Sequence, residues 1–367
     1  NGGQGNDTVD FSRFAGQVSL DLTDGDARSS YHVTLPGGGE ARGVAMIANI
    51  SGIENVIASL DADTFTGNGK DNTFTYIGAF GYQVDQGGFD TYSGGNGNDT
   101  VDLSRLDAQK VALDLNDGIV GASYSVSLPD GGSAIGFSQV ARVSDMENVI
   151  ASLNDDTLKG SDSDNTFYFV GSFNIDSQTG GIDDYDGRGG SNMIDLSKFQ
   201  GHTWVSLKDG IVSSSYTYQA DDGFGGAVTE LATVTNIQNA VGSAQSDTFE
   251  GTSGANTFVG GGGNDLLIGN EGTDQLTGGI GADTFVFGSG FGADLVTDFT
   301  VSSIRRIRHD VIEFSKSVFA DWDHVQAAIT DTDDGAVITL DNDNSITLAG
   351  VTKQALIDNH DSDFVFV

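Results

Sequence analysis

The chain has 367 residues, of which 53 are acidic and 16 are basic, so its formal net charge is −37. It contains 53 glycines, 2 prolines and no cysteine. These values exclude a disulfide-stapled scaffold, a collagen triple helix and a general nucleic-acid-binding protein, which needs basic patches. No apolar run reaches the roughly 18 residues of a membrane helix, so the sequence predicts no membrane span.

Aspartate accounts for most of the acidic residues, since only seven of the 53 are glutamate. A short carboxylate close to the backbone suits cation coordination in tight turns. The chain starts at Asn1 inside a glycine-rich motif and has no basic, apolar leader. We therefore expect it to be the C-terminal part of a longer protein.

The first recognisable element is a nine-residue motif at residues 2–10, with the pattern Gly-Gly-x-Gly-x-Asp-x-apolar-x. Residues 94–102, 260–268 and 278–286 repeat it, and residues 269–277 match with Asn270 at the second position. Six residues would form a turn that glycine alone follows easily, and three would form a short strand with its middle residue facing inward. Two such units make one flattened coil, so the sequence predicts an all-β fold, a parallel β-roll or β-helix solenoid.

Turns on one side of such a roll lie above one another, because every second repeat unit returns to the same side. Their carbonyl and carboxylate oxygens can enclose Ca²⁺, which takes six to eight oxygen ligands. The predicted cofactor is therefore Ca²⁺, with several ions. The predicted metal-site residues are Asp7, Asp99, Gly260, Gly262, Asp265, Gly269, Asp274, Gly278 and Asp283, with weaker candidates at Asp63, Asp156 and Asp247.

An insertion that the roll does not require follows the first motif. Residues 18–50 contain alternating strand-like runs, a strand with Tyr31 and a glycine-rich hairpin. Residues 111–143 and 205–234 repeat this arrangement with Tyr124 and Tyr216. Alternation predicts one buried and one solvated face. A ligand site on these hairpins is one interpretation, and a half-buried structural tyrosine is the alternative that we favour for any single position.

The insertions belong to a longer repeat of about 92 residues, because Asp10, Asp102 and Asp195 begin equivalent segments. Five nine-residue units then fill residues 242–286 without interruption. The predicted domains are two β-roll units (1–93 and 94–186), a degenerate third unit (187–241), a calcium β-roll (242–287) and a C-terminal capping and secretion domain (288–367).

The C-terminal segment reads as mixed structure. Apolar residues at helical spacing predict a helix over residues 317–329. Residues 336–340 and 345–348 read as a hairpin, and residues 351–359 as a second short helix. The basic run at residues 305–309 has no assigned role.

The nine-residue motifs resemble those of RTX, or hemolysin-type calcium-binding, proteins of Gram-negative bacteria. The segments at residues 292–299 and 310–314 resemble the C-terminal domains of serralysin-like proteases and the calcium modules of alginate C5-epimerases. This resemblance implies secretion to the cell surface or medium through type I secretion machinery, which reads an uncleaved C-terminal signal. The acidic and then apolar ending at residues 361–367 fits such a signal.

The enzymatic question stays open at the sequence level. A His-Glu-x-x-His motif is absent, so a zinc protease is not expected, and no nucleophile elbow is present. Family association suggests extracellular polysaccharide as a partner, with a uronic-acid C5-epimerase or lyase as one alternative and an adhesin or surface-layer module as another. The candidates for catalysis are Tyr31, His32, Arg42, Tyr124, Arg142, His202, Tyr216 and Tyr218.

Overall fold

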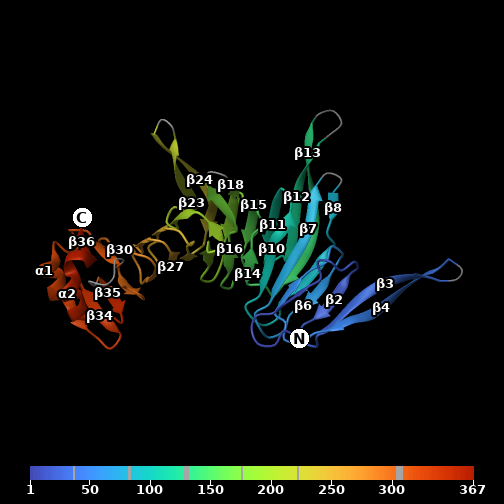
Figure 1. Cartoon of the computed structure of the whole chain (residues 1–367), viewed down its shortest axis with the longest axis horizontal. Helices are drawn as coiled ribbons and strands as arrows, with labels where there is room; N and C mark the ends of the chain where they lie inside the picture. Colours follow the sequence, from blue (N-terminus) through green and yellow to red (C-terminus); the bar gives the residue numbers. More distant parts are fainter. Residues whose placement is uncertain (36–37, 82–83, 128–131, 175–176, 221–222, 303–308) are drawn as a thin grey trace. The chain divides into compact units, whose positions relative to one another are not determined.

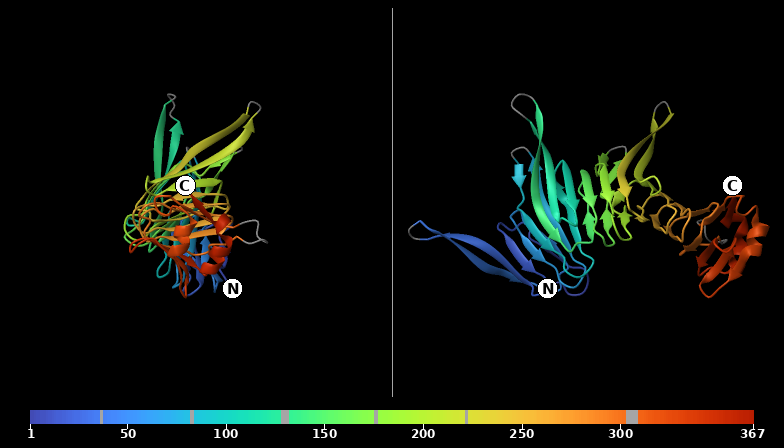
Figure 2. Two further views of the ribbon diagram at one scale, coloured as in Figure 1. Left: turned by 90° about the vertical axis from the view of Figure 1, so that its left-hand side faces the viewer. Right: turned by 180° about the vertical axis from the view of Figure 1, so that it is seen from behind.

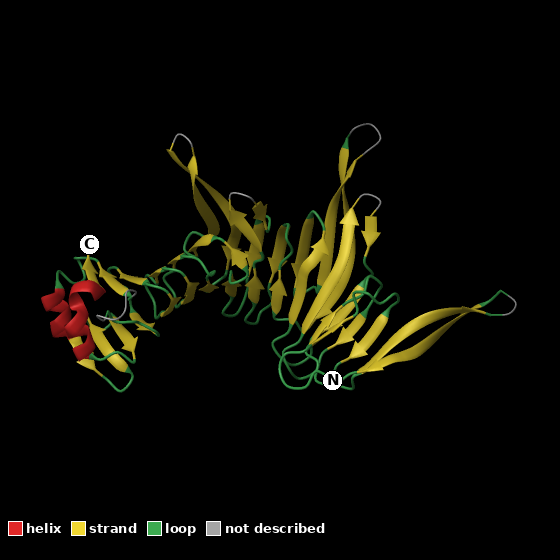
Figure 3. Ribbon diagram, viewed as in Figure 1, coloured by secondary structure: helices red, strands yellow, loops and turns green. Residues whose placement is uncertain are grey.

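A computed structural model of the chain describes residues 1–35, 38–81, 84–127, 132–174, 177–220, 223–302 and 309–367. Most of the basic run at residues 305–309 lies outside this part. The contacts divide the chain into two compact units. Unit 1 comprises residues 1–170 and 179–190, and unit 2 comprises residues 171–178 and 191–367. Strands dominate both units, and the two helices found among the described residues lie in the C-terminal segment of unit 2 (Figures 1 and 3).

One face of unit 1 is a parallel ladder of short strands. Its central side chains, such as Val56, Phe74 and Val149, are fully buried, because a three-residue strand turns only its middle residue inward. The ladder runs in the order β1 (Thr8–Asp10), β5 (Asn55–Ile57), β7 (Thr73–Gly81), β10 (Thr100–Asp107), β14 (Asn148–Ile150) and β16 (Thr166–Tyr168), and β8 (Val84–Gln86) pairs with β7.

The other face of unit 1 carries two of the predicted hairpins, whose arms project from the unit (Figures 1 and 2). Each hairpin follows a roll strand that pairs with it in antiparallel fashion. The strand order is β4 (Glu40–Asn49), β3 (Asp26–Thr34), β2 (Val18–Asp21), β6 (Thr64–Thr66), β9 (Asp90–Ser93), β13 (Ser133–Ser144), β12 (Ile119–Ser127), β11 (Lys110–Asp114), β15 (Asp155–Lys159) and β19 (Asp183–Asp186).

Unit 2 repeats the two-faced arrangement. In residues 242–287 each strand pairs with the strand two repeat units later, as Leu266 does with Thr284. The first face is β20 (Met193–Asp195), β25 (Asn239–Val241), β27 (Thr257–Gly262), β29 (Gln275–Ile280), β31 (Ala293–Val296), β35 (Ser345–Ala349), β34 (Gly335–Thr339) and β33 (Ile329–Asp331).

The second face of unit 2 carries the third hairpin. It is β24 (Gly223–Thr235), β23 (Ile211–Ala220), β22 (His202–Ser206), β26 (Thr248–Glu250), β28 (Leu266–Ile268), β30 (Thr284–Phe287), β32 (Val311–Phe314) and β36 (Phe364–Phe366). A small sheet joins β18 (Ser177–Thr179), β17 (Gly171–Asn174) and β21 (Phe199–Gln200). The prediction of an all-β parallel β-roll is confirmed.

The C-terminal segment closes the open end of both faces of unit 2. Helix α1 (Trp322–Ala328) is shorter than predicted, because Asp321 caps it and accepts a hydrogen bond from the His324 amide, and Ile329 already belongs to β33. Helix α2 (Lys353–Asp363) and the hairpin β34–β35 confirm the other two predictions. Neither described helix has the length and apolar character that crossing a bilayer requires.

Candidate metal sites

The nine-residue turns place an aspartate carboxylate against a glycine backbone. A methyl group on Gly94, Gly260 or Gly278 would collide with the carboxylate five residues later. At Gly260 it would also meet the carbonyl oxygen of Gly278, which belongs to the next turn on the same side of the roll. The first glycine of the motif is therefore required because oxygens of two successive turns converge beside it.

One oxygen of each of Asp265, Asp274 and Asp283 is used in stacking the coils. The amide of Asp247 donates to Asp265 Oδ1 at 2.7 Å, and the amide of Asp265 donates to Asp283 Oδ1 at 2.9 Å. The amide of Asn256 donates in the same way to Asp274 Oδ1 at 2.8 Å. Each bond joins a turn to the next one on its own side, so the bonds form one ladder through Asp247, Asp265 and Asp283 and another, on the opposite side of the roll, through Asn256 and Asp274.

The other oxygen has no partner in the turns that match the full motif. Oδ2 is buried without a hydrogen bond in the described structure at the five strongest metal-ligand candidates of the sequence, and burying such an atom unpaired is costly. These five residues are Asp7, Asp99, Asp265, Asp274 and Asp283.

The second residue of these turns explains the missing bond. Gly3, Gly95, Gly261, Asn270 and Gly279 all have left-handed backbone conformations, with φ between 68° and 100°. Glycine adopts this region freely and asparagine tolerates it better than most residues. Gly262 follows at the end of β27, where its amide donates to the Ser243 carbonyl at 3.2 Å.

Burial raises the pKa of four of these carboxyls, those of Asp99, Asp265, Asp274 and Asp283, in the absence of a cation. The pKa of Asp265 rises to about 7 and that of Asp274 to about 6. Burial likewise raises the pKa of Asp99 to about 6, and the neighbouring charges of Glu147, Asp71 and Asp145 add to the effect. A bound cation would reverse this shift, since it favours the ionised form.

The donor set fits a hard cation. Within the described part of the chain, no three His, Asp or Glu side chains are grouped to hold a metal. A cation in these turns would therefore meet one carboxylate per turn, together with backbone carbonyls such as that of Gly278. Oxygen-only ligation of this kind is what Ca²⁺ prefers.

The weaker candidates Asp63, Asp156 and Asp247 are placed differently. Oδ2 of each accepts a hydrogen bond of 2.6 Å from the amide of the serine at the second position of its own turn. Their carboxylates are thus partnered within the protein.

Sequence reasoning missed several groups that complete the turns. The carboxylates of Glu54 and Glu147 accept from the amides of Asp7 and Asp99, at 3.0 and 2.8 Å. The two glutamates lie 93 residues apart, at equivalent positions of the repeat of about 92 residues, which was the available signal. Nothing in the spacing indicated that they would reach turns so far away along the chain.

The catalytic candidates lie on the hairpins. The Tyr31 and Tyr124 rings lie over Gly43 and Gly136 of the neighbouring strands. A tyrosine covering a cross-strand glycine is a packing arrangement, which agrees with the structural interpretation favoured above.

The other candidates are spread along the strands. Arg42 donates to Gln17 Oε1 at 3.2 Å, and its backbone pairs with that of His32. Arg142 is exposed on β13. His202 Nδ1 shares a hydrogen bond with the Ser246 carbonyl. The side chains of His32, Tyr216 and Tyr218 lie outside the described part of the structure.

Two open depressions of about 400 Å³ each lie beside hairpins at equivalent positions of the repeat. In unit 1 the depression is lined by Ala112, Phe137 and Thr157. In unit 2 it is lined by the corresponding Trp204, Val228 and Thr248. Phe137, Trp204 and Val228 are all more than half exposed, so each depression presents apolar surface to solvent.

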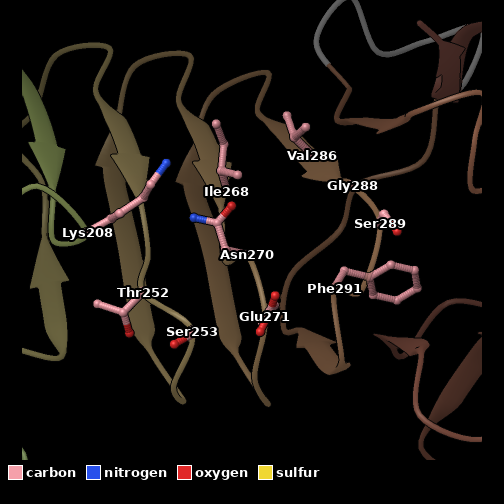
Figure 4. A pocket seen from close by; sticks show the side chains of 10 residues that line it. All are labelled: Lys208, Thr252, Ser253, Ile268, Asn270, Glu271, Val286, Gly288, Ser289 and Phe291. Atoms are coloured by element: carbon pink, nitrogen blue, oxygen red, sulfur yellow. The ribbon is translucent and has the colours of Figure 1, made fainter.

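A third depression, of about 510 Å³, lies on the segment of nine-residue repeats in unit 2 (Figure 4). It is lined by turn residues of successive coils, among them Thr252 and Asn270. Lys208 at its edge forms an ion pair with Glu250 at 3.0 Å.

Comparison with known families bears directly on these turns. The model of the RTX calcium-binding nonapeptide repeat matches four times, at residues 86–104, 241–276, 250–285 and 259–293. The chain therefore carries RTX-type calcium-binding repeats in these two stretches. Of the five aspartates with an unpaired Oδ2, all but Asp7 lie in the matched RTX repeats. No curated protein matches the chain.

Proposed function

We propose that this RTX-type chain is a secreted module whose β-roll completes its folding when calcium enters the turns. The observation that carries the proposal is the set of five buried, unpaired aspartate oxygens. The proposed ligands are Asp7, Asp99, Asp265, Asp274 and Asp283, with turn carbonyls including those of Gly260, Gly262, Gly269 and Gly278.

The net charge supports calcium-coupled folding. At −37 the chain repels itself, and buried carboxylates oppose compaction until a cation neutralises them. Low calcium before export and higher calcium outside would then separate secretion from folding. Type I export from a Gram-negative bacterium is part of the proposal, because RTX repeats typically accompany that route.

The experiment is a calcium titration of the full chain from a chelated start, followed by far-UV circular dichroism and gel filtration. We expect strand signal and compaction to rise together with calcium. Magnesium at equal ionic strength is the control, since it keeps its waters and prefers octahedral sites. Identical spectra and elution volumes with chelator and with calcium would contradict the proposal.

Polysaccharide binding is a second proposal, supported by the paired depressions beside the hairpins. Trp204 is 53% exposed and Phe137 61% exposed. Exposed aromatic rings on a strand surface can stack on the apolar faces of sugar rings, while neighbouring hydroxyls such as that of Thr248 supply hydrogen bonds. Bound calcium would bridge the acidic protein to an acidic polymer.

Binding of alginate, heparosan and pectin in calcium tests this second proposal. We expect Trp204→Ala to weaken binding several-fold. Leu153→Ala is the control, because Leu153 is also about half exposed but lines neither depression. Appearance of unsaturated product in the same samples would favour the lyase alternative, and solvent deuterium at C5 the epimerase. Equal binding by Trp204→Ala and wild type would refute this use of the depressions.

A further inference from the structure

The nine-residue turns fall into classes according to which group, if any, donates a hydrogen bond to the side-chain oxygen of the sixth residue. In the turns ending at Asp7, Asp99, Asp265, Asp274 and Asp283, the second residue is left-handed and Oδ2 is unpaired. In a second class, the second residue donates its amide to the side-chain oxygen of the sixth. This class comprises Ser59 with Asp63, Asn68 with Asn72, Ser152 with Asp156, Ser161 with Asn165, Ser243 with Asp247 and Thr252 with Asn256.

The serine turns saturate both carboxylate oxygens. Asp247 Oδ2 accepts from the amide of Ser243 at 2.6 Å, and the single hydroxyl proton of Ser243 is shared between this oxygen, at 3.0 Å, and the Gly201 carbonyl, at 2.9 Å. Its Oδ1 accepts from the amide and hydroxyl of Thr203, at 2.5 and 2.8 Å. The hydroxyl of Ser243 in turn accepts the amide of Gln245 at 3.0 Å. Both carboxylate oxygens of Asp247 therefore have protein donors.

The same arrangement recurs once in each long repeat. Ser59 donates its amide and hydroxyl to Asp63, whose Oδ1 accepts the Val18 amide at 2.7 Å. Ser152 donates in the same two ways to Asp156. Val18 and Thr203 belong to the strands that lead into the hairpins, so each of their serine turns ties a hairpin to the roll.

A third class replaces the serine by a tyrosine hydroxyl. Tyr92 donates to Asp90 Oδ2 and Tyr185 to Asp183 Oδ2, from two residues further along each strand. Oδ1 of each accepts the amide of a serine-turn aspartate, Asp63 or Asp156, at 2.8 and 2.9 Å. Each serine turn in unit 1 is therefore hydrogen-bonded to a neighbouring turn whose aspartate oxygens also have protein donors.

We propose that the second residue of each turn decides whether the turn takes up calcium, and that the Ser59–Asp63, Ser152–Asp156 and Ser243–Asp247 turns are metal-free clasps. A left-handed residue leaves the carboxylate oxygen for an ion. Serine supplies an amide and a hydroxyl in the place of the ion. The clasps hold the hairpins to the roll without calcium, and only the glycine and Asn270 turns respond to it. Figure 4 shows Thr252, the second residue of its turn, in the coil next to that of Asn270.

This inference rests on the calcium-dependent function proposed above. The test counts calcium ions bound per full-length chain at saturating free calcium, by equilibrium dialysis and metal analysis. The matched variants are Asp265→Asn and Asp247→Asn, which make the same chemical change in neighbouring turns on one side of the roll. We expect Asp265→Asn to lose at least one ion and Asp247→Asn to keep the wild-type number.

Ser243→Ala is the second variant, in case Asp247→Asn does not fold. It removes the hydroxyl and keeps the amide. We expect the number of bound calcium ions to be unchanged. The unfolding temperature should fall below that of wild type by a similar amount in calcium and in chelator. Loss of an ion from Asp247→Asn or Ser243→Ala would overturn the inference. A wild-type chain that binds no calcium would instead overturn the function on which it rests.

Discussion

The same coil of turns and short strands occurs in residues 260–287 of unit 2 and in residues 146–168 of unit 1. The two regions differ in how their turn side chains are hydrogen-bonded. Both bury an apolar side chain in the middle of every strand, with Leu267 and Phe285 in the first and Val149 and Phe167 in the second fully buried. The first region holds three carboxylates with an unpaired oxygen, whereas the second holds a serine-bound Asp156 and a neutral Asn165. The same coil can thus be closed by an ion or by the protein itself.

The difference teaches that hydrophobic stacking and charge compensation are separable in this fold. Burial of the inward side chains favours both regions equally. Only the first region carries the cost of buried, unpaired carboxylates when calcium is absent. Calcium dependence should therefore be local, and the following predictions test how local it is.

The largest expected effect is that of calcium removal. With chelator, hydrogen exchange of β28 and β30 should accelerate strongly, because their turns hold Asp265, Asp274 and Asp283. Exchange of β14 and β16 should change much less. Hydrogen-exchange mass spectrometry of the full chain measures both. Equal loss of protection in the two regions would show that calcium dependence is global.

A large effect is also expected from Gly278→Ala. The added methyl group would overlap Asp283 Oδ2, so calcium affinity and the unfolding temperature in calcium should both fall. Gly288→Ala is the matched control, since nothing lies within 4 Å of its added methyl group. Calorimetric titration and thermal unfolding compare the two variants. A Gly278→Ala chain that behaves like Gly288→Ala would contradict the placement of the ion beside this glycine.

A medium effect is expected from pH, through the buried Asp–Tyr pairs. Burial raises the pKa of Asp90 to about 8 and that of Asp183 to about 9. The folded state therefore holds these protons more tightly than the unfolded state, whose carboxyls titrate near pH 4. Their contribution to stability is complete below about pH 4 and is lost as the pH rises through 8 to 9.

The measurement is thermal unfolding at pH 5 and pH 9 in saturating calcium. The contribution of Asp90 and Asp183 should make the unfolding temperature higher at pH 5 than at pH 9. The double variant Asp90→Asn/Asp183→Asn should show a smaller difference between the two pH values than wild type. An unchanged difference would mean that the pairs do not titrate in this range.

The smallest effect is expected on the hairpins. Tyr124→Ala uncovers Gly136 and should lower the free energy of unfolding by about 1 kcal/mol or less, equally with and without calcium. Tyr124→Phe keeps the ring and should match wild type. Urea unfolding of the three chains provides the comparison. Loss of polysaccharide modification in Tyr124→Phe would instead support a chemical role for the hydroxyl.

The sequence predicted the fold because few backbone arrangements are compatible with this nine-residue pattern. Glycine positions required left-handed turns, and one apolar residue in every three-residue strand required an interior. The hairpins and the second helix were also predicted. The first helix was predicted too long, because the pattern did not reveal that Asp321 caps it and that Ile329 joins a strand.

By itself, then, the sequence determined the coil, the aspartate positions and the class of ion. Only the tertiary structure decided how Oδ1 of the serine-turn aspartates is satisfied, because its donors come from far along the chain, whereas Oδ2 is bound by the serine of the same turn. The Thr203 hydroxyl reaches Asp247 from 44 residues away and the Val18 amide reaches Asp63 from 45. A repeat pattern records spacing within a turn, whereas the satisfaction of a buried carboxylate depends on every group that folding brings to it.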